Sequence, residues 1–311
     1  MTARTNRSTN DVARRATAHR RLRRTSCSVV LCMVALVVVR APVHVDSIVE
    51  ASRPQPCFVT KQASELTEST VATQAAATGN LPCIEHLVKA GADVDGADKY
   101  DQTPLHVAAW VGKVDVAVAL MTAGADVDKV NKAGNTPLHV AAWVGNVDVA
   151  VALIKAGADV DKANSIGNTP LHAATRHDKV DVAVAVAVAL IKAGADVDKA
   201  DKYGRTPLHV AARYGTADVA VALMEAGADV DKADEYSNTP LHVAAQEGKV
   251  DVVVALMTVV ADVDKANMFR KTPLHVATLH DKVDVVGALV KAGADVDKVN
   301  INGNTPLHVA T

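Results

Sequence analysis

Histidine is the residue type with the most chemical potential in this sequence, because an imidazole can bind a metal ion or transfer a proton. Successive copies of one histidine motif are 33 residues apart, except for one interval of 37. Zinc ligands must converge within about 2.1 Å of one ion, whereas these histidines occur once per interval. We therefore expect them to make structural hydrogen bonds. The motif is Thr-Pro-Leu-His, and its copies start at Thr103, Thr136, Thr169, Thr206, Thr239, Thr272 and Thr305.

Paired aspartates recur in a second motif, Gly-Ala-Asp-Val-Asp, and runs such as Asp196, Asp198 and Asp201 are similar to the start of a calcium-binding loop. An EF-hand loop needs ligands at positions 1, 3 and 5, a Gly at position 6 and a Glu at position 12. Here the third acid falls at position 6 and no Glu follows. We therefore expect a solvated loop edge without a metal.

Other catalytic patterns are missing from the sequence. It has no Gly-rich phosphate loop, no nucleophile elbow and no Cys-x-x-Cys pair. His177 and His280 stand outside the repeated motif but are three units apart. The prediction is a protein that is not an enzyme and has no cofactor and no metal.

The elements that position these residues follow from one repeat. Thr103 can cap a helix, Pro104 suits the first helical position, and Gly112 permits the left-handed conformation that ends a helix. A second helix follows and ends at Gly124, and an extended hairpin loop leads to the next unit. Helices this short are marginal alone, so each unit must bury its apolar face on its neighbours. The second helix is marked by Val114, Ala117, Val118, Leu120 and Met121.

This pattern resembles the ankyrin repeat, through Thr-Pro-Leu-His-Val-Ala-Ala at 103–109, the Gly after each helix, and Gly-Ala-Asp-Val-Asp. The resemblance implies an all-α fold, a solenoid of helix-turn-helix-hairpin units of 33 residues. It also implies a concave binding face and partner binding without catalysis. We expect the array to cover 67–311, with a degenerate first unit at 70–102, six units at 103–304 and a truncated unit at 305–311.

Three departures from the repeat predict local differences. The unit starting at Thr169 is four residues longer, within a Val-Ala tract at 182–189, which predicts one extra helical turn. Val260 replaces a Gly for which a left-handed conformation is expected, which would cost a β-branched residue about 1–2 kcal/mol. Asp178 and Asp281 replace the Gly after the first helix, and Asp tolerates that conformation better. We expect the 239–271 unit to be the least protected internal unit against hydrogen exchange.

The first 40 residues form a basic leader, with nine Arg and one Asp and a net charge of +8. Residues 26–39 form a short apolar run, and 41–66 is expected to be a linker. Three interpretations remain open: a signal peptide or membrane anchor, a transit peptide, or a start without a targeting role. The location is accordingly membrane-associated or secretory if 26–39 is a signal or anchor, and otherwise cytoplasmic. The remaining residues carry 24 basic and 34 acidic side chains, a net charge of −10, which argues against nucleic-acid binding.

The family resemblance places variable, groove-facing residues just before the Gly of each first helix and at each loop tip. Seven of the eight aromatic residues of the chain lie at these positions, and Trp, Tyr and Arg dominate binding hot spots. We therefore expect a monomer that binds an extended or helical protein segment. The alternative is that the rings shield the groove or pack between loops. The predicted partner-binding residues are Tyr100, Trp110, Val111, Trp143, Val144, Arg176, His177, Tyr203, Arg213, Tyr214, Tyr236 and Phe269.

Two further hypotheses differ in class. The chain can be the ankyrin portion of a larger channel, signalling protein or enzyme that is truncated at Thr311. A hydrolase or metal site within the repeats is the weaker of the two. The expected principal function is a non-catalytic protein-protein interaction scaffold.

Overall fold

A computed structural model of the chain describes residues 68–176, 180–259 and 261–310. Within these ranges it is all-helical and has no strands, as predicted. Fourteen α-helices alternate with loops and are followed by the short 3₁₀ helix η3 (Pro306–Val309). The helices are α3 (Glu68–Thr78), α4 (Leu81–Lys89), α5 (Pro104–Val111), α6 (Val114–Thr122), α7 (Pro137–Val144), α8 (Val147–Lys155), α9 (Pro170–Ala174), α10 (Val180–Lys192), α11 (Pro207–Tyr214), α12 (Ala217–Glu225), α13 (Pro240–Glu247), α14 (Val250–Thr258), α15 (Pro273–Leu279) and α16 (Val283–Lys291).

Each unit from Thr103 onward begins with the predicted cap. At α5, the backbone N–H of His106 donates to Oγ1 of Thr103, and Nδ1 of His106 accepts the backbone N–H of Thr103. This reciprocal pair satisfies two backbone donors that a helix start otherwise leaves without partners. Pro104 occupies the first helical position, and Gly112 ends α5 at a φ of 79°. The local assignments made from the sequence are therefore confirmed for this unit.

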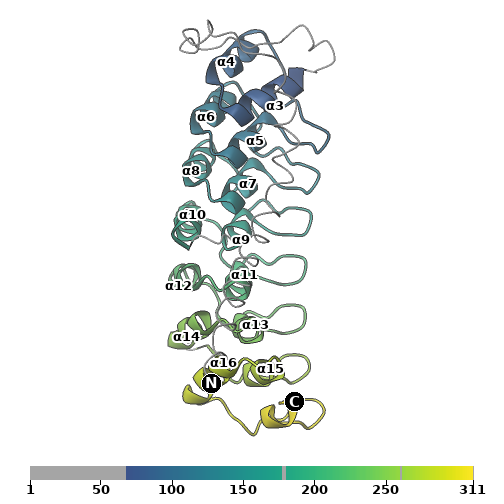
Figure 1. Cartoon of the computed structure of the whole chain (residues 1–311), viewed down its shortest axis with the longest axis vertical. Coiled ribbons are helices and arrows are strands. Elements are labelled where there is room, and N and C mark those ends of the chain that lie inside the picture. The colour runs from purple at the N-terminus through teal and green to yellow at the C-terminus, as the bar shows by residue number, and fades with distance from the viewer. Residues whose placement is uncertain (1–67, 177–179, 260, 311) are drawn as a thin grey trace, which may run out of the picture. The chain divides into compact units, whose positions relative to one another are not determined.

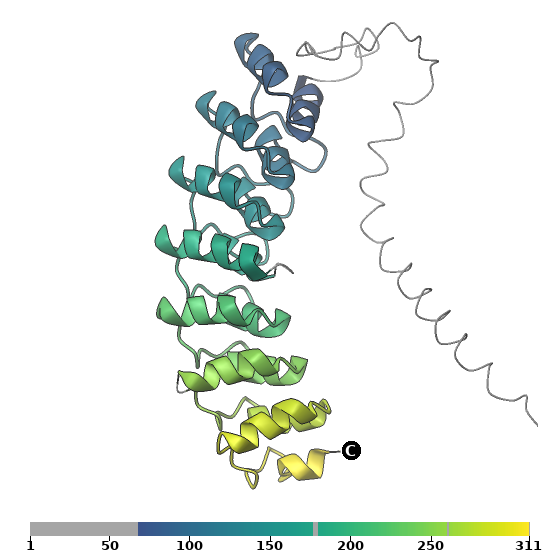
Figure 2. The ribbon, with the colours of Figure 1, turned by 60° about the vertical axis from the view of Figure 1, so that its left-hand side comes forward.

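The helix pairs stack into one elongated array in which the odd-numbered and even-numbered helices form two columns (Figures 1 and 2). We call these the inner and outer helices. The hairpin loops project from the side of the inner helices (Figure 1). Each inner helix packs on the inner helices of the neighbouring units, and each outer helix does the same. No unit therefore has a core of its own, and burial requires its neighbours.

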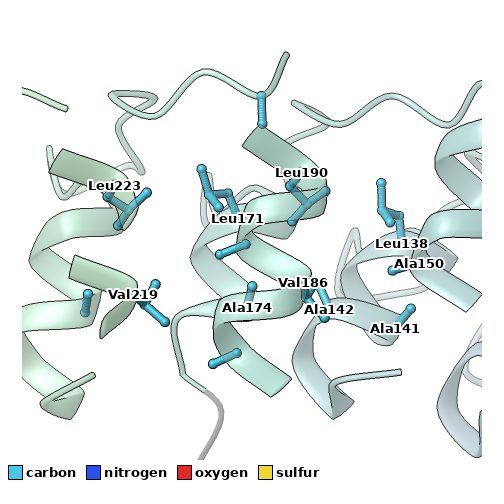
Figure 3. Packing of buried hydrophobic residues seen from close by; sticks show 14 of the residues in the cluster. Leu138, Ala141, Ala142, Ala150, Leu171, Ala174, Val186, Leu190, Val219 and Leu223 are labelled. Atoms are coloured by element: carbon cyan, nitrogen blue, oxygen red, sulfur yellow. The ribbon is translucent and has the colours of Figure 1, made fainter. Parts of the chain in front are cut away.

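The core consists of small and medium aliphatic side chains that recur at equivalent positions. Leu138 and Leu171 are fully buried on inner helices, and Leu190 and Leu223 are fully buried on outer helices. Figure 3 shows these leucines with alanines such as Ala141 between the helices. Alanine allows the helix axes to approach closely, so the core needs no aromatic ring.

The four extra residues of the unit starting at Thr169 lengthen its outer helix, as predicted. Helix α10 has 13 residues, whereas the other outer helices have nine. Its last turns bury Val186, Ala187 and Leu190 in the positions that Val149, Ala150 and Leu153 occupy in α8. Four residues are close to one turn of 3.6, so the buried face is preserved.

The inner helix of the same unit is a correction to the prediction. The repeat pattern places Arg176 within this helix, but α9 has only five residues and ends at Ala174. Its cap is Thr175, whose hydroxyl donates to the carbonyl oxygen of His172 at 2.8 Å. This bond competes with continuation of the helix.

The glycine replacements have different outcomes. Asp281 adopts a φ of 54°, so the prediction that Asp tolerates the left-handed conformation is confirmed there. The glycines equivalent to Val260 have positive φ, for example 92° at Gly227. Val260 and Asp178 lie outside the described residues, as do the leader at 1–40, its apolar run at 26–39 and the expected linker at 41–66. Among the described helices, none is long and apolar enough to span a membrane.

Candidate functional site

The motif histidines bridge consecutive units. Nε2 of His139 donates to the carbonyl oxygen of Asn168 at 2.9 Å, and Nδ1 accepts the N–H of Thr136 at 3.1 Å. The ring must therefore be neutral with its proton on Nε2. Burial lowers the pKa of this histidine to about 4, and it lowers the pKa of His242 to about 4 as well. The equivalent bridge occurs at His106, His172, His209, His242 and His275.

The paired aspartates form a second ladder between units. The carboxylate of Asp128 accepts the backbone N–H of Asp159 at 3.0 Å, and Asp159 in turn accepts the N–H of Asp161 within its own loop. The same contacts recur from Asp95 to Asp295. In the part of the chain that the structure describes, no group of three or more His, Cys, Asp or Glu could hold a metal ion. These carboxylates cap turns.

The loop tips carry exposed side chains on a connected backbone. The carbonyl oxygen of Tyr203 accepts the N–H of Glu235 at 3.0 Å, and that of Tyr236 accepts the N–H of Met268 at 3.1 Å. One such bond joins each successive pair of tips. The exposed fractions are 45% for Tyr203 and 50% for Tyr236. The bonds fix the spacing of the tips, while their side chains remain accessible.

Trp110 and Trp143 form a pair at equivalent positions of adjacent inner helices. Their ring centroids are 5.4 Å apart and their planes meet at 62°, an edge-to-face arrangement. Trp110 is 46% exposed and Trp143 is 50% exposed. Asn146 supports the backbone below them, because its Nδ2 donates to the carbonyl oxygens of Ala109 and Trp110. The pair is an ordered apolar platform that remains half open to solvent.

Arginine and tyrosine side chains line a pocket of about 260 Å³ formed by residues between Asn168 and Glu247, which we call the arginine-tyrosine pocket. It brings together five of the predicted residues: Arg176, Tyr203, Arg213, Tyr214 and Tyr236. The guanidinium of Arg176 lies over the Tyr214 ring, 5.2 Å from its centroid. Nε of Arg213 is 3.8 Å from Oε1 of Glu247, which is too long for a hydrogen bond. The negative charge of Glu235 raises the pKa of Tyr236.

The other predicted site residues are less closely grouped. Tyr100 is 54% exposed with Nζ of Lys99 over its ring, and Phe269 is 46% exposed. Val111 is exposed, whereas Val144 is half-buried against the core. His177 lies outside the described residues. Of these residues, the four that the structure describes do not line the arginine-tyrosine pocket.

Sequence reasoning missed Arg205, which also lines the pocket. Its guanidinium lies 4.7 Å from the centroid of the Tyr203 ring, and Nε and Nη2 both donate to Oδ2 of Asp201. Asp201 and Arg205 are four residues apart around the loop tip, and that opposite-charge spacing was a usable signal. Asn or Gln occupies the Arg205 position in most units and Lys271 occupies it in one, so Arg205 is the only arginine at this position.

A family model of ankyrin repeats (three copies) matches residues 45–131, 115–187, 184–267 and 241–311. The chain belongs to the ankyrin-repeat family. Among solved structures, its array is similar to the human ASB11 ankyrin repeat domain, with 29% sequence identity and a TM-score of 0.63. The likeness covers 72% of this chain and 98% of that one. A comparison with curated proteins found no match.

Membership of the ankyrin-repeat family gives the site its general role. Ankyrin repeats are typically protein-protein interaction modules and are generally not enzymes. In this ankyrin array, the histidines and aspartates most suited to chemistry are used as structural bridges. Side chains at the inner-helix ends and loop tips, such as Trp110 and Tyr203, remain exposed.

Proposed function

We propose that this ankyrin array is a non-catalytic scaffold that binds an extended or helical segment of a partner protein in its concave groove. The observation that carries the proposal is the Trp110–Trp143 pair, held edge to face yet half exposed. The core is aliphatic throughout, so these rings are not needed to fill it. Large, ordered and half-exposed aromatic side chains are typical anchors for a partner.

The arginine-tyrosine pocket extends the same surface toward the later units. Tyr203 and Tyr236 stand at the loop tips, Arg213 and Tyr214 stand at the end of α11, and Arg176 follows α9. A segment running along the groove would therefore meet an apolar platform first and a polar, aromatic pocket next. Tyr100 and Phe269 would lengthen the contact at the two ends. We include Val111, Val144 and His177 in the proposed surface through their positions in the repeat.

The test is proximity labelling and pull-down with the full chain. The test variant combines Trp110→Ala, Trp143→Ala, Tyr203→Ala and Tyr214→Ala, and circular dichroism checks its folding. A matched control replaces Val221 and Val254, which are exposed apolar residues on outer helices, by Ala. Loss of the same partners from the test variant alone supports groove binding. Retention of all partners by the folded test variant would show that the groove residues are structural.

A further inference from the structure

Charged side chains on the proposed binding surface are concentrated at the arginine-tyrosine pocket, which is lined by Arg176, Arg205 and Arg213. Arg176 and Arg213 occupy corresponding positions of two successive repeats, Arg176 just after α9 and Arg213 in the last turn of α11. Trp110 and Trp143 belong to the two units immediately before these two. The pocket is also lined by three acidic side chains: Oδ1 of Asp234 accepts the N–H groups of Tyr236 and Asn238, Glu235 acts on Tyr236, and Glu247 faces Arg213.

The three arginines of the pocket differ in how far their charge is neutralised. Arg205 is bound to Asp201 at 2.6 Å. Arg213 has Glu247 at 3.8 Å, so its N–H groups receive charge compensation without a hydrogen bond. For Arg176, no carboxylate of the described residues lies within ion-pair distance, and its contact is the Tyr214 ring. Two guanidinium groups at one pocket therefore have donors to offer.

Tyr214 lies next to both arginines. The guanidinium of Arg176 lies over its ring, and Arg213 precedes Tyr214 in the chain on the same helix end. A guanidinium beside an aromatic ring can still bind a carboxylate through two parallel N–H donors. The hydroxyls of Tyr203 and Tyr214 add further donors around the pocket.

We infer that the pocket receives an acidic side chain of the partner between Arg176 and Arg213, while an apolar residue of the same segment covers Trp110 and Trp143. The inference rests on the proposed groove binding and specifies its partner. Neighbouring inner helices are typically about 8–10 Å apart. The two sites are centred two units apart, or about 16–20 Å, which about five to six extended residues span.

The partner segment is therefore an extended peptide in which Asp or Glu stands about five to six residues from a large apolar residue. A helical segment would need about 11–13 residues between them, because its rise is about 1.5 Å per residue. Glu247 competes with the partner's acidic residue for Arg213. Because Glu247 lies 3.8 Å from Arg213, the partner's carboxylate displaces only a weak contact.

The experiment uses the full chain to select from a displayed library of random 16-residue peptides. The leading peptide is then titrated against the chain, with its acidic residue intact or changed to the amide. Peptides with the predicted spacing, and affinity that falls about fivefold to tenfold on amide substitution, are the expected result. The variant Arg176→Gln should bind the acidic peptide with an affinity lowered by the same factor, and Glu247→Gln should bind it more tightly. Lys129→Gln removes one charge from an exposed loop residue outside the pocket and should bind normally.

A charge exchange makes the test specific. The variant Arg176→Glu should bind the acidic peptide more weakly than the natural chain does. The same variant should bind well to a peptide in which the acidic residue is replaced by Lys. Peptides that need Trp110 and Trp143 but bind equally well as the amide would overturn the acidic pocket and leave groove binding intact. Failure to select any peptide, or selected peptides that are indifferent to Trp110→Ala with Trp143→Ala, would contradict both proposals.

Discussion

The Nε2 atom of His139 lies 2.9 Å from the carbonyl oxygen of Asn168, and this bond crosses from one repeat to the next. The histidine closes the cap of its own helix with the other ring nitrogen. One side chain thus links the start of an inner helix to the following loop. Because the bridge recurs along the array, helix formation and unit stacking depend on the same residues.

Replacement of His139 by Ala should lower the free energy of unfolding by about 2–4 kcal/mol. The variant leaves the buried N–H of Thr136 without its partner, removes one of the two hydrogen bonds to the carbonyl oxygen of Asn168 and opens a cavity. Urea denaturation followed by circular dichroism measures the loss. His308 has the same cap but is exposed, so His308→Ala should change stability by less than about 0.5 kcal/mol. Equal losses in the two variants would contradict a bridging role.

Acid should destabilise the array over a defined range of pH. Burial lowers the folded-state pKa of His139 and His242 from 6.5 to about 4, so the native state favours the neutral rings. The neutral rings contribute fully to the free energy of unfolding above pH 6.5. This contribution is lost as the pH falls from 6.5 toward about 4. Each such histidine should account for about 1.4 kcal/mol per pH unit in that range. Urea midpoints measured from pH 7.5 to pH 4.5 test this.

A variant isolates the histidine share of that acid sensitivity. The stability difference between the natural chain and His139→Ala should shrink as the pH falls below 6.5, because protonation of the unfolded state penalises only the natural chain. A difference that stays constant from pH 7.5 to pH 4.5 would exclude titration of His139 as a cause.

Val260→Gly should raise the free energy of unfolding by about 1–2 kcal/mol, because the equivalent glycines have positive φ. Hydrogen exchange should also become slower across 239–271, the unit that we expect to be the least protected in the natural chain. The reverse substitution, Gly227→Val, meets open space at its Cβ position but requires a φ of 92°, so it should lose a similar amount. A neutral Val260→Gly with uniform exchange across the array would refute the prediction.

Trp143→Ala should reduce stability far less than truncation of a core residue beside it. An edge-to-face pair contributes about 0.5–1.5 kcal/mol beyond burial, whereas replacing a fully buried leucine such as Leu138 by Ala costs about 2–5 kcal/mol. Urea denaturation of the two single variants gives the comparison. If Trp143→Ala is as costly as Leu138→Ala, the tryptophan is a structural residue and the alternative that the rings pack the groove gains support.

The regular parts of this fold could be predicted because each depends on a few neighbouring residues. Thr103, Pro104 and Gly112 define a helix start and end through local backbone chemistry, and the structure has them in those roles. The extra turn of α10 was predictable as well, because a four-residue insertion is nearly one helical period. Repetition supplied the rest, since one unit interpreted correctly describes its neighbours.

What was missed depends on contacts that one repeat does not reveal. α9 ends early, at a cap where the hydroxyl of Thr175 donates to the carbonyl oxygen of His172. Val144 is half-buried whereas Val111 is exposed, although both end the same eight-residue helix sequence. The stacking of Arg176 on Tyr214 joins residues 38 positions apart across the irregular unit. Such pairings require the actual distance between units, which spacing in the sequence does not provide.

Helices α5 and α7 have the same eight-residue sequence, Pro-Leu-His-Val-Ala-Ala-Trp-Val. Each can therefore occupy the other's place with no loss of side-chain complementarity within the helix itself. During refolding, a shift of the stacking register by one unit costs little free energy at this point of the array, because the two helices have the same sequence. The correct register therefore depends on the dissimilar units on either side.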